Sequence, residues 1–212
     1  MTDKIFCATT IQQYWRKKNK NDILNWIHTR GKCKNKKNKI IPTVMLFKLY
    51  CGFREKQLNH FKIERALGCR IGRRENFPDA ISENLVLYAL KKKGIESTWI
   101  TESGDLKYKS GDSWKKGEVK ARQNGPSQFS PSSLWDTLFF VDAESHLYGE
   151  ITIYMIENIY EIVSNLKVNS TETLNTQAKN GRRARFNIKN KLKKYLTPEH
   201  TIYKGTISSL LK

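Results

Sequence analysis

Three ionisable residues that could act together on a phosphate lie within one short segment of the chain. Gly111 and Asp112 indicate a turn between two strands. In a hairpin that is symmetric about this pair, Asp105 faces Glu118, because both are equally far from the turn. Residues two apart on a strand share a face, so Glu118 and Lys120 point the same way. The spacing therefore predicts two carboxylates and one ammonium group at a single spot.

Two carboxylates that face each other across strands repel, so this pair needs a compensating charge. A hard divalent cation with oxygen ligands provides it, and we expect Mg²⁺ to bind to Asp105 and Glu118. The ion would polarise a phosphodiester and make a water molecule more acidic. Lys120 would stabilise the developing negative charge or help to position the attacking water. These residues predict a hydrolytic site.

Two alternatives compete with this interpretation. Glu-x-Lys tripeptides arise by chance in a chain with 39 lysines and arginines, and the second strand could be a solvated edge strand with Val119 turned inward. Asp112 is a rival to Asp105 as the metal-binding acid. Aspartates are common in turns, however, and Asp112 would lie at the tip of the hairpin, away from Lys120.

The charge balance of the chain indicates a polyanionic partner. The 39 basic residues outnumber 20 acidic ones, which gives a formal net charge of +19 over 212 residues. A compact protein with this excess repels itself unless it binds a polyanion, and nucleic acid is the commonest one. An anionic membrane surface is the competing partner, but the lysines occur in interrupted clusters instead of along one amphipathic helix. We therefore expect salt-dependent binding to nucleic acid.

Other sequence features indicate a cytoplasmic protein without a membrane span. The chain contains no apolar run of 18 residues, and its N-terminus becomes polar too early for a secretory signal. The four cysteines, Cys7, Cys33, Cys51 and Cys69, are too far apart for a typical zinc site. We expect them to be free thiols in a reducing compartment, and we expect no small-molecule cofactor.

The periodicity of apolar residues predicts an α+β fold in two parts. Residues 1–75 are predicted to form a basic helical region. We expect helices in it over Thr10–Arg30, from Pro42 to Tyr50 and from Phe61 to Leu67. A solvated loop over Lys32–Lys39 is expected between the first two. Residues 76–212 form the second part, in which a helix begins at Pro78 and ends at Gly94. Five strands are expected next, over Thr98–Thr101, Asp105–Lys109, Gly117–Arg122, Leu134–Asp142 and Glu150–Ile156. Helices over Thr171–Lys179 and Phe186–Tyr195 and a strand over Thr201–Tyr203 complete the chain.

Asp105 followed by Glu118-Val119-Lys120 resembles the bipartite PD-(D/E)xK nuclease motif, and the segments around it are similar to a group of type II restriction endonucleases. In that group the catalytic strand leads into a Gly-Pro-Ser-Ser-Phe-Gly-Pro loop and a Gly-Arg-Arg-Pro-Arg segment follows later. The matching segments here are Gly104–Leu106, Gly117–Ala121, Gly125–Pro131, Leu134–Asp136, Leu138–Ala143 and Asn180–Phe186. The chain departs from the group at Gln128, Ser130 and Ala184, and none of these is a residue of the acidic hairpin.

The resemblance implies a restriction-endonuclease-like core, and it implies Mg²⁺-dependent cleavage of double-stranded DNA at a short specific sequence. In PD-(D/E)xK nucleases a glutamate from the preceding helix often joins the metal shell, and Glu83 matches that place. Its other interpretation is a first-turn glutamate favoured by the helix dipole. We expect a homodimer, because a two-fold dimer can cut both strands of a palindromic site. The DNA-contacting candidates are Arg182, Arg183, Arg185, Ser127, Gln128 and Ser132.

Two other functions use the same features. A repair or junction nuclease could be built on the same core, and a non-catalytic module could bind DNA or RNA through the basic surface alone. Replacement of Asp105 or Lys120 separates the second of these from a nuclease, since a pure binding module never cuts.

Overall fold

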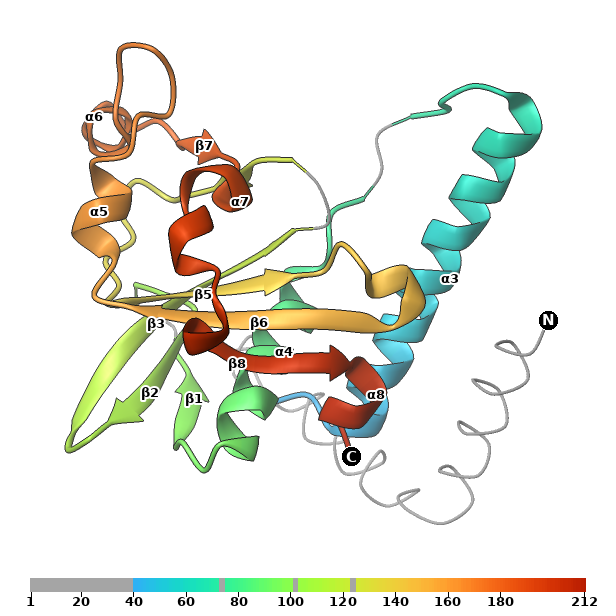
Figure 1. Cartoon of the computed structure of the whole chain (residues 1–212), viewed down its shortest axis with the longest axis horizontal. Helices are drawn as coiled ribbons and strands as arrows, with labels where there is room; N and C mark the ends of the chain where they lie inside the picture. The colour runs from blue at the N-terminus through green and yellow to red at the C-terminus, as the bar shows by residue number, and fades with distance from the viewer. Residues whose placement is uncertain (1–39, 73–74, 101–102, 123–124) are drawn as a thin grey trace, which may run out of the picture.

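The fold is α+β, as the sequence predicts, and is consistent with a restriction-endonuclease-like core. The computed structural model describes residues 40–72, 75–100, 103–122 and 125–212. A six-stranded mixed sheet in the order β1-β2-β3-β5-β6-β8 forms its centre (Figure 1). β3 and β5 pair in parallel, and the other neighbours in this sheet are antiparallel. The strands are β1 (Ser97–Trp99), β2 (Leu106–Ser110), β3 (Ser113–Arg122), β5 (Thr137–Asp142), β6 (Glu150–Glu157) and β8 (Thr201–Thr206).

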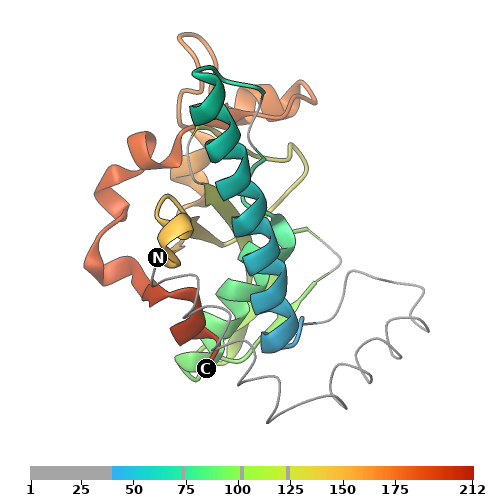
Figure 2. The same cartoon turned by 90° about the vertical axis from the view of Figure 1, so that its right-hand side faces the viewer.

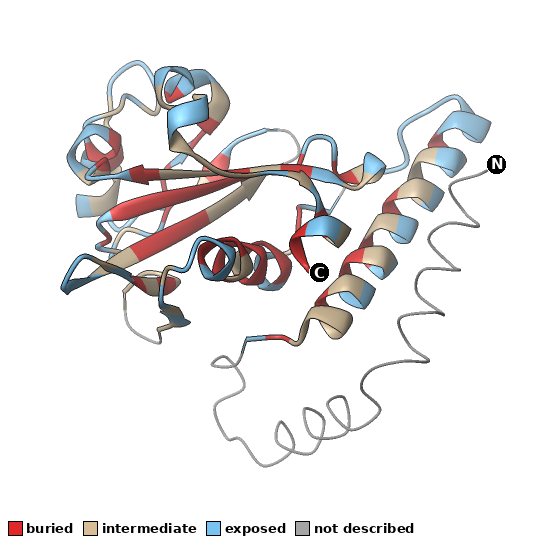
Figure 3. Cartoon of the chain, turned by 60° about the horizontal axis from the view of Figure 1, so that its bottom comes forward, coloured by how far each residue is buried: buried red, intermediate tan, exposed pale blue. Residues whose placement is uncertain are grey.

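The central strand β5 is buried on both faces, which places the core on both sides of the sheet. Phe139 and Val141 enter one hydrophobic cluster, whereas Leu138 and Phe140 enter another. Successive side chains of a strand point to opposite faces, so a nearly unbroken apolar run is what a doubly covered strand requires. The buried residues in Figure 3 accordingly run along the middle of the sheet and along the helix surfaces turned toward it.

Helices of different lengths cover the two faces. The first face packs against α3 (Thr43–Leu67), α4 (Asp79–Lys92) and α8 (Ile207–Leu210). The second is covered by α5 (Tyr160–Ser164), α6 (Leu174–Lys179), α7 (Ile188–Lys191) and a small sheet of β4 (Ser127–Gln128) and β7 (Arg185–Phe186). Three short 3-10 helices, η1 (His146–Tyr148), η2 (Lys193–Tyr195) and η3 (Pro198–His200), lie in the connections.

The long helix α3 corrects the prediction of two separate helices over its span. Leu46, Tyr50, Phe53 and Gln57 recur every three or four residues and are all buried, so a single stripe continues through the expected break. The helix ends at Leu67, as predicted, and Gly68 caps it in the left-handed region with a φ of 64°.

Hydrogen bonds attach α3 to the sheet side of the molecule. The Tyr50 hydroxyl donates to the backbone carbonyl of His146, and Arg54 Nε donates to that of Leu147 at 2.6 Å. Figure 2 shows α3 crossing the molecule from end to end. The N-terminal half of α3 also packs in the first core, so these contacts hold that half of the helix against the sheet.

The prediction of one continuous helix over Phe186–Tyr195 is wrong. Its first residue belongs to β7, and the remainder divides into α7 and η2. The Asn187 side chain accepts from the Asn190 backbone N–H and starts α7 as a separate short helix.

The expected helix over Thr10–Arg30 and loop over Lys32–Lys39 lie outside the described residues. Among the described helices, none has the length and apolarity needed to cross a membrane.

Gly117 is a position where the sheet has no room for a side chain, and it tests the packing beneath the hairpin. A Cβ at Gly117 would lie 2.5 Å from Phe139 Cε2 and 3.0 Å from Leu106 Cδ1. We expect Gly117→Ala to lower the free energy of unfolding by about 1–3 kcal/mol, because the added methyl group would overpack the core around it. Urea denaturation followed by circular dichroism measures the change.

Gly52 supplies the matched control, because a Cβ there meets nothing within 4 Å and the residue lies inside α3. Gly52→Ala is expected to raise the free energy of unfolding by about 0.5–1 kcal/mol, since alanine loses less backbone entropy in a helix. Equal effects at the two positions would contradict the packing described here.

Candidate active site

The hairpin formed by β2 and β3 has the register that symmetry about Gly111 and Asp112 predicts. Leu106 pairs with Gly117 and Ser110 with Ser113, so the turn falls at residues 111–112. Asp105 lies just before β2, and its backbone N–H donates to the Gly117 carbonyl at 2.9 Å. The strand therefore starts one residue later than expected, but the pairing continues back to the aspartate.

The Asp105 carboxylate is fixed by the strand opposite it. Its Oδ2 accepts a hydrogen bond of 2.7 Å from the Val119 backbone N–H, which holds the side chain across β3. Within the described part of the chain, its Oδ1 accepts no hydrogen bond, so one oxygen remains available for another ligand. Burial and the neighbouring Glu118 raise the pKa of Asp105 to about 6, although Lys120 and the Val119 N–H act in the opposite direction.

Glu118 and Lys120 form an ion pair in the middle of β3. Lys120 Nζ lies 2.5 Å from Glu118 Oε1, and the Ser133 hydroxyl donates to Glu118 Oε2 at 2.8 Å. Glu118 is only 4% exposed, so its charge requires these partners. A serine from the loop before β5 thus helps to hold the acid in place.

Helix α4 brings a third carboxyl group, that of Glu83, to the same place. The helix packs on β3. Burial and the charges of Asp105 and Asp79 raise the pKa of Glu83 to about 8, while Lys120 lowers it. Glu83 and Asp105 also line the same cleft. The helix and the hairpin therefore share one acidic site.

These residues line one cleft of about 770 Å³. Asp105, Glu118, Lys120 and Glu83 all line it, together with four of the expected DNA-contacting residues, Ser127, Gln128, Ser132 and Arg183. The other two lie elsewhere. Arg182 forms an ion pair with Glu172, and Arg185 lines a neighbouring cleft.

Sequence reasoning missed three residues of this cleft. Ser133 binds Glu118, and Asp79 adds a further carboxylate at the start of α4. The Ser103 hydroxyl donates to the Leu134 carbonyl at 2.9 Å and also accepts from the Leu134 backbone N–H, so it joins the segment before Asp105 to the loop before β5. The contacts of Ser103 and Ser133 join segments that the sequence gives no reason to connect.

The chemistry of the site suits Mg²⁺, although a complete set of ligands is not preformed. Among residues 40–212, outside the three short gaps in the description, no group of three or more His, Cys, Asp and Glu is arranged to hold a metal ion. Mg²⁺ needs no such group, because it commonly takes one or two carboxylates and keeps several waters. Burial is the largest cause of the raised pKa values of Asp105 and Glu83, and the neighbouring carboxylates add a repulsion that a bound cation would relieve.

The fold and this cleft define a class of protein, in which a mixed sheet carries a buried acidic hairpin with an adjacent lysine. A family model for the Bsp6I restriction endonuclease matches residues 54–195, about two thirds of the chain. The chain belongs to this family, and the expected kinship with type II restriction endonucleases is confirmed. No curated protein and no solved structure gives a significant match.

The raised pKa of Glu83 predicts how the stability of the protein depends on pH without a divalent cation. Between the ordinary value of 4.5 and about 8, the folded state binds more protons than the unfolded state. The free energy of unfolding should therefore fall as the pH rises through that window. Glu83→Gln should flatten the fall and make the metal-free protein more stable at pH 8, as thermal melts in EDTA would show.

Glu150→Gln is the matched control, because Glu150 is exposed on β6 and the substitution removes the same charge. It should leave the pH dependence of the melting temperature as in the wild type. A Glu83→Gln protein that melts with the wild-type pH profile would contradict the burial of a carboxyl group among other carboxylates.

Proposed function

We propose that this protein is a type II restriction enzyme that hydrolyses phosphodiester bonds of double-stranded DNA at a short specific sequence, with Mg²⁺ as its cofactor. Membership of the Bsp6I restriction endonuclease family supports the restriction activity. The observation that carries the chemistry is that Asp105, Glu118 and Lys120 line one cleft and are linked through β3.

Asp105 and Glu118 are the residues that would hold Mg²⁺, with Glu83 as a supporting carboxylate. The ion, when bound, supplies positive charge to the phosphate and acidifies water. Asp105 Oδ1, which accepts no hydrogen bond within the described residues, and the two Glu118 oxygens, which Lys120 and Ser133 contact, are the atoms that would bind the ion. Lys120 Nζ donates to Glu118 Oε1, so its ammonium group lies where positive charge is favoured.

Lys120 stabilises negative charge as it develops on the phosphate, or orients the attacking water. Its Nζ lies 5.5 Å from the centroid of the Phe129 ring, and its side chain is 18% exposed. The surrounding residues exclude most of the solvent from the ammonium group. A charge in such a position acts more strongly than one in water.

The surface around the acids suits a polyanion. Arg183, Gln128 and Ser132 line the cleft of the catalytic group, and Arg182 and Arg185 flank Arg183 in the sequence. Ser127 lines the same cleft but is only 1% exposed. With a net charge of +19, the protein attracts DNA over a long range, and the attraction weakens with salt. Arg182 contacts DNA only if it exchanges its ion pair with Glu172.

We also propose that the enzyme acts as a homodimer in the cytoplasm. One catalytic group cuts one strand, so a second copy related by a two-fold axis supplies the cut in the other strand of a palindromic site. The division into a helical region over residues 1–75 and a nuclease core over residues 76–212 stays a prediction.

Single substitutions in the acidic hairpin should separate cleavage from binding. Asp105→Asn, Glu118→Gln and Lys120→Ala are each expected to lower the cleavage rate by more than about a hundredfold in Mg²⁺, because each removes a ligand or the charge that assists the reaction. Binding of uncleaved DNA in Ca²⁺ should persist. Single-turnover digestion of phage DNA and a gel-shift assay measure the two properties.

Asp112→Asn is the control on the same hairpin, since Asp112 is exposed at the turn. It should cut at the wild-type rate. If the wild-type protein binds DNA but never cuts it, the protein is a non-catalytic DNA-binding module. Cleavage confined to branched or nicked substrates would indicate a repair or junction nuclease.

A further inference from the structure

The two-stranded sheet of β4 and β7 presents one polar face, and that face is made by Gln128 and Arg185. The strands are antiparallel, with Gln128 opposite Arg185 and Ser127 opposite Phe186. The Phe129 backbone N–H donates to the Ala184 carbonyl at 2.9 Å and extends the pairing. Residues directly opposite each other share a face, so Gln128 and Arg185 lie side by side.

The other face of this small sheet is fixed in the second core. Ser127 and Phe186 are buried, and the Phe186 ring stacks on that of Phe129 with centroids 4.8 Å apart. Alternation along each strand then sends Gln128 and Arg185 away from the core. Arg185 is exposed and Gln128 is partly exposed, so a rigid support holds two polar side chains outward.

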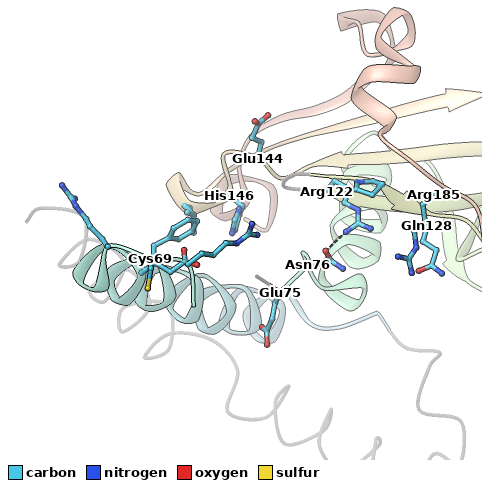
Figure 4. Close-up of a pocket in the computed structure, with 15 residues that line it drawn as sticks. Cys69, Glu75, Asn76, Arg122, Gln128, Glu144, His146 and Arg185 are labelled. Carbon is cyan, nitrogen blue, oxygen red and sulfur yellow. Dashed lines mark hydrogen bonds between the residues drawn. The ribbon is translucent and has the colours of Figure 1, made fainter. Parts of the chain in front are cut away.

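These side chains line a second cleft of about 970 Å³ between the small sheet and the C-terminal half of α3 (Figure 4). In Figure 4 Gln128 and Arg185 extend beside each other on the side opposite α3. Asn76, Arg122 and Gln128 line both this cleft and the catalytic one. The two clefts are therefore continuous, and a duplex cut in one extends past the other.

The charges in the second cleft leave Arg185 among the cations available for a ligand, and Arg65 and Arg70 line the same cleft on the side of α3. Each carboxylate of the cleft already has a cationic or histidine partner: Glu64 pairs with His60, Glu75 with Lys56, and Glu144 with Lys189. Arg122 NH1 donates to Asn76 Oδ1 at 2.5 Å. By contrast, the side chains of Arg185 and Gln128 have no hydrogen-bond or ion-pair partner in the described part of the chain.

We propose that Gln128 and Arg185 read base edges of the DNA, whereas Arg183 contacts the phosphate backbone near the cut; this assignment rests on the proposed function. An arginine fork pairs with the two acceptors of guanine, and a glutamine amide pairs with the donor and acceptor of adenine. A two-stranded ribbon is narrow enough to enter a major groove. Arg183 lines the catalytic cleft itself, where the scissile phosphate must lie.

The test is a sequence selection with the full-length protein from a random duplex library. One arm recovers DNA bound in Ca²⁺, and the other sequences the ends produced in Mg²⁺. Arg185→Ala and Gln128→Ala should each lose discrimination at one or two base positions, by about tenfold to a hundredfold. Arg183→Ala should weaken binding to all sequences alike and reduce the salt dependence by about one counterion.

Arg185→Lys separates the shape of the side chain from its charge. It keeps the positive charge and loses the fork, so it should also lose discrimination while it keeps the wild-type salt dependence. Lys109→Ala is the matched control, because Lys109 is exposed on the hairpin, does not line either cleft and carries the same charge. It should retain the full wild-type preference. Thermal melts check that each variant is folded.

The outcomes distinguish this inference from the proposed function. If Arg185→Ala and Gln128→Ala leave every base preference unchanged, the assignment is overturned, whether overall affinity falls or not. If the wild type selects no sequence in Ca²⁺, it is overturned as well. A third outcome is that the wild type selects a sequence and the variants relax this selection, but neither the wild type nor any variant cuts DNA in Mg²⁺. In that case Gln128 and Arg185 do read bases, and the proposed catalytic function is wrong.

Discussion

The site depends on the electrostatic cost of holding several carboxyl groups together in a partly buried cleft. The pKa of Glu83 is raised to about 8 and that of Asp105 to about 6, and in both cases burial is the main cause and a neighbouring acid adds to it. A protein tolerates such crowding where positive charge can be supplied. Lys120 supplies part of this charge, and a divalent cation would supply the rest.

The fold withstands this repulsion because the elements that carry the acids are packed from both sides. Phe139 and Val141 fix β5 to the first core, and Leu138 and Phe140 fix it to the second. β3, which carries Glu118 and Lys120, pairs with β5 in register and cannot move away without breaking that pairing. The favourable energy of apolar packing therefore offsets the repulsion between the charges, as is common at functional sites.

The hairpin could be predicted from the sequence because its contacts are local. Asp105 and Glu118 are 13 residues apart, and a turn at Gly111 fixes their register by counting. The position of Glu83 at the same site was expected only through the family resemblance, since helix periodicity shows which side is apolar but not which strand the helix covers. The α+β class followed from the order of patterns along the chain.

Contacts between distant segments could not be predicted. The parallel pairing of β3 with β5, the bond from Ser133 to Glu118, and the small sheet of Gln128 and Arg185 all depend on how the chain folds back after residue 125. The break between Phe186 and Ile188 was missed because a strand of two residues leaves no periodic signal. The sequence predicts two helices where α3 is one, because Gly52 and polar residues interrupt the apolar pattern although the buried stripe continues.

The most direct test of the central claim is anomalous scattering from Mn²⁺ in crystals of the protein with a specific DNA duplex. The account predicts a peak within about 2.5 Å of carboxylate oxygens from both Asp105 and Glu118, beside a DNA phosphate. A peak bound by other residues, or a DNA complex whose cleft holds no cation beside these two carboxylates, would contradict it.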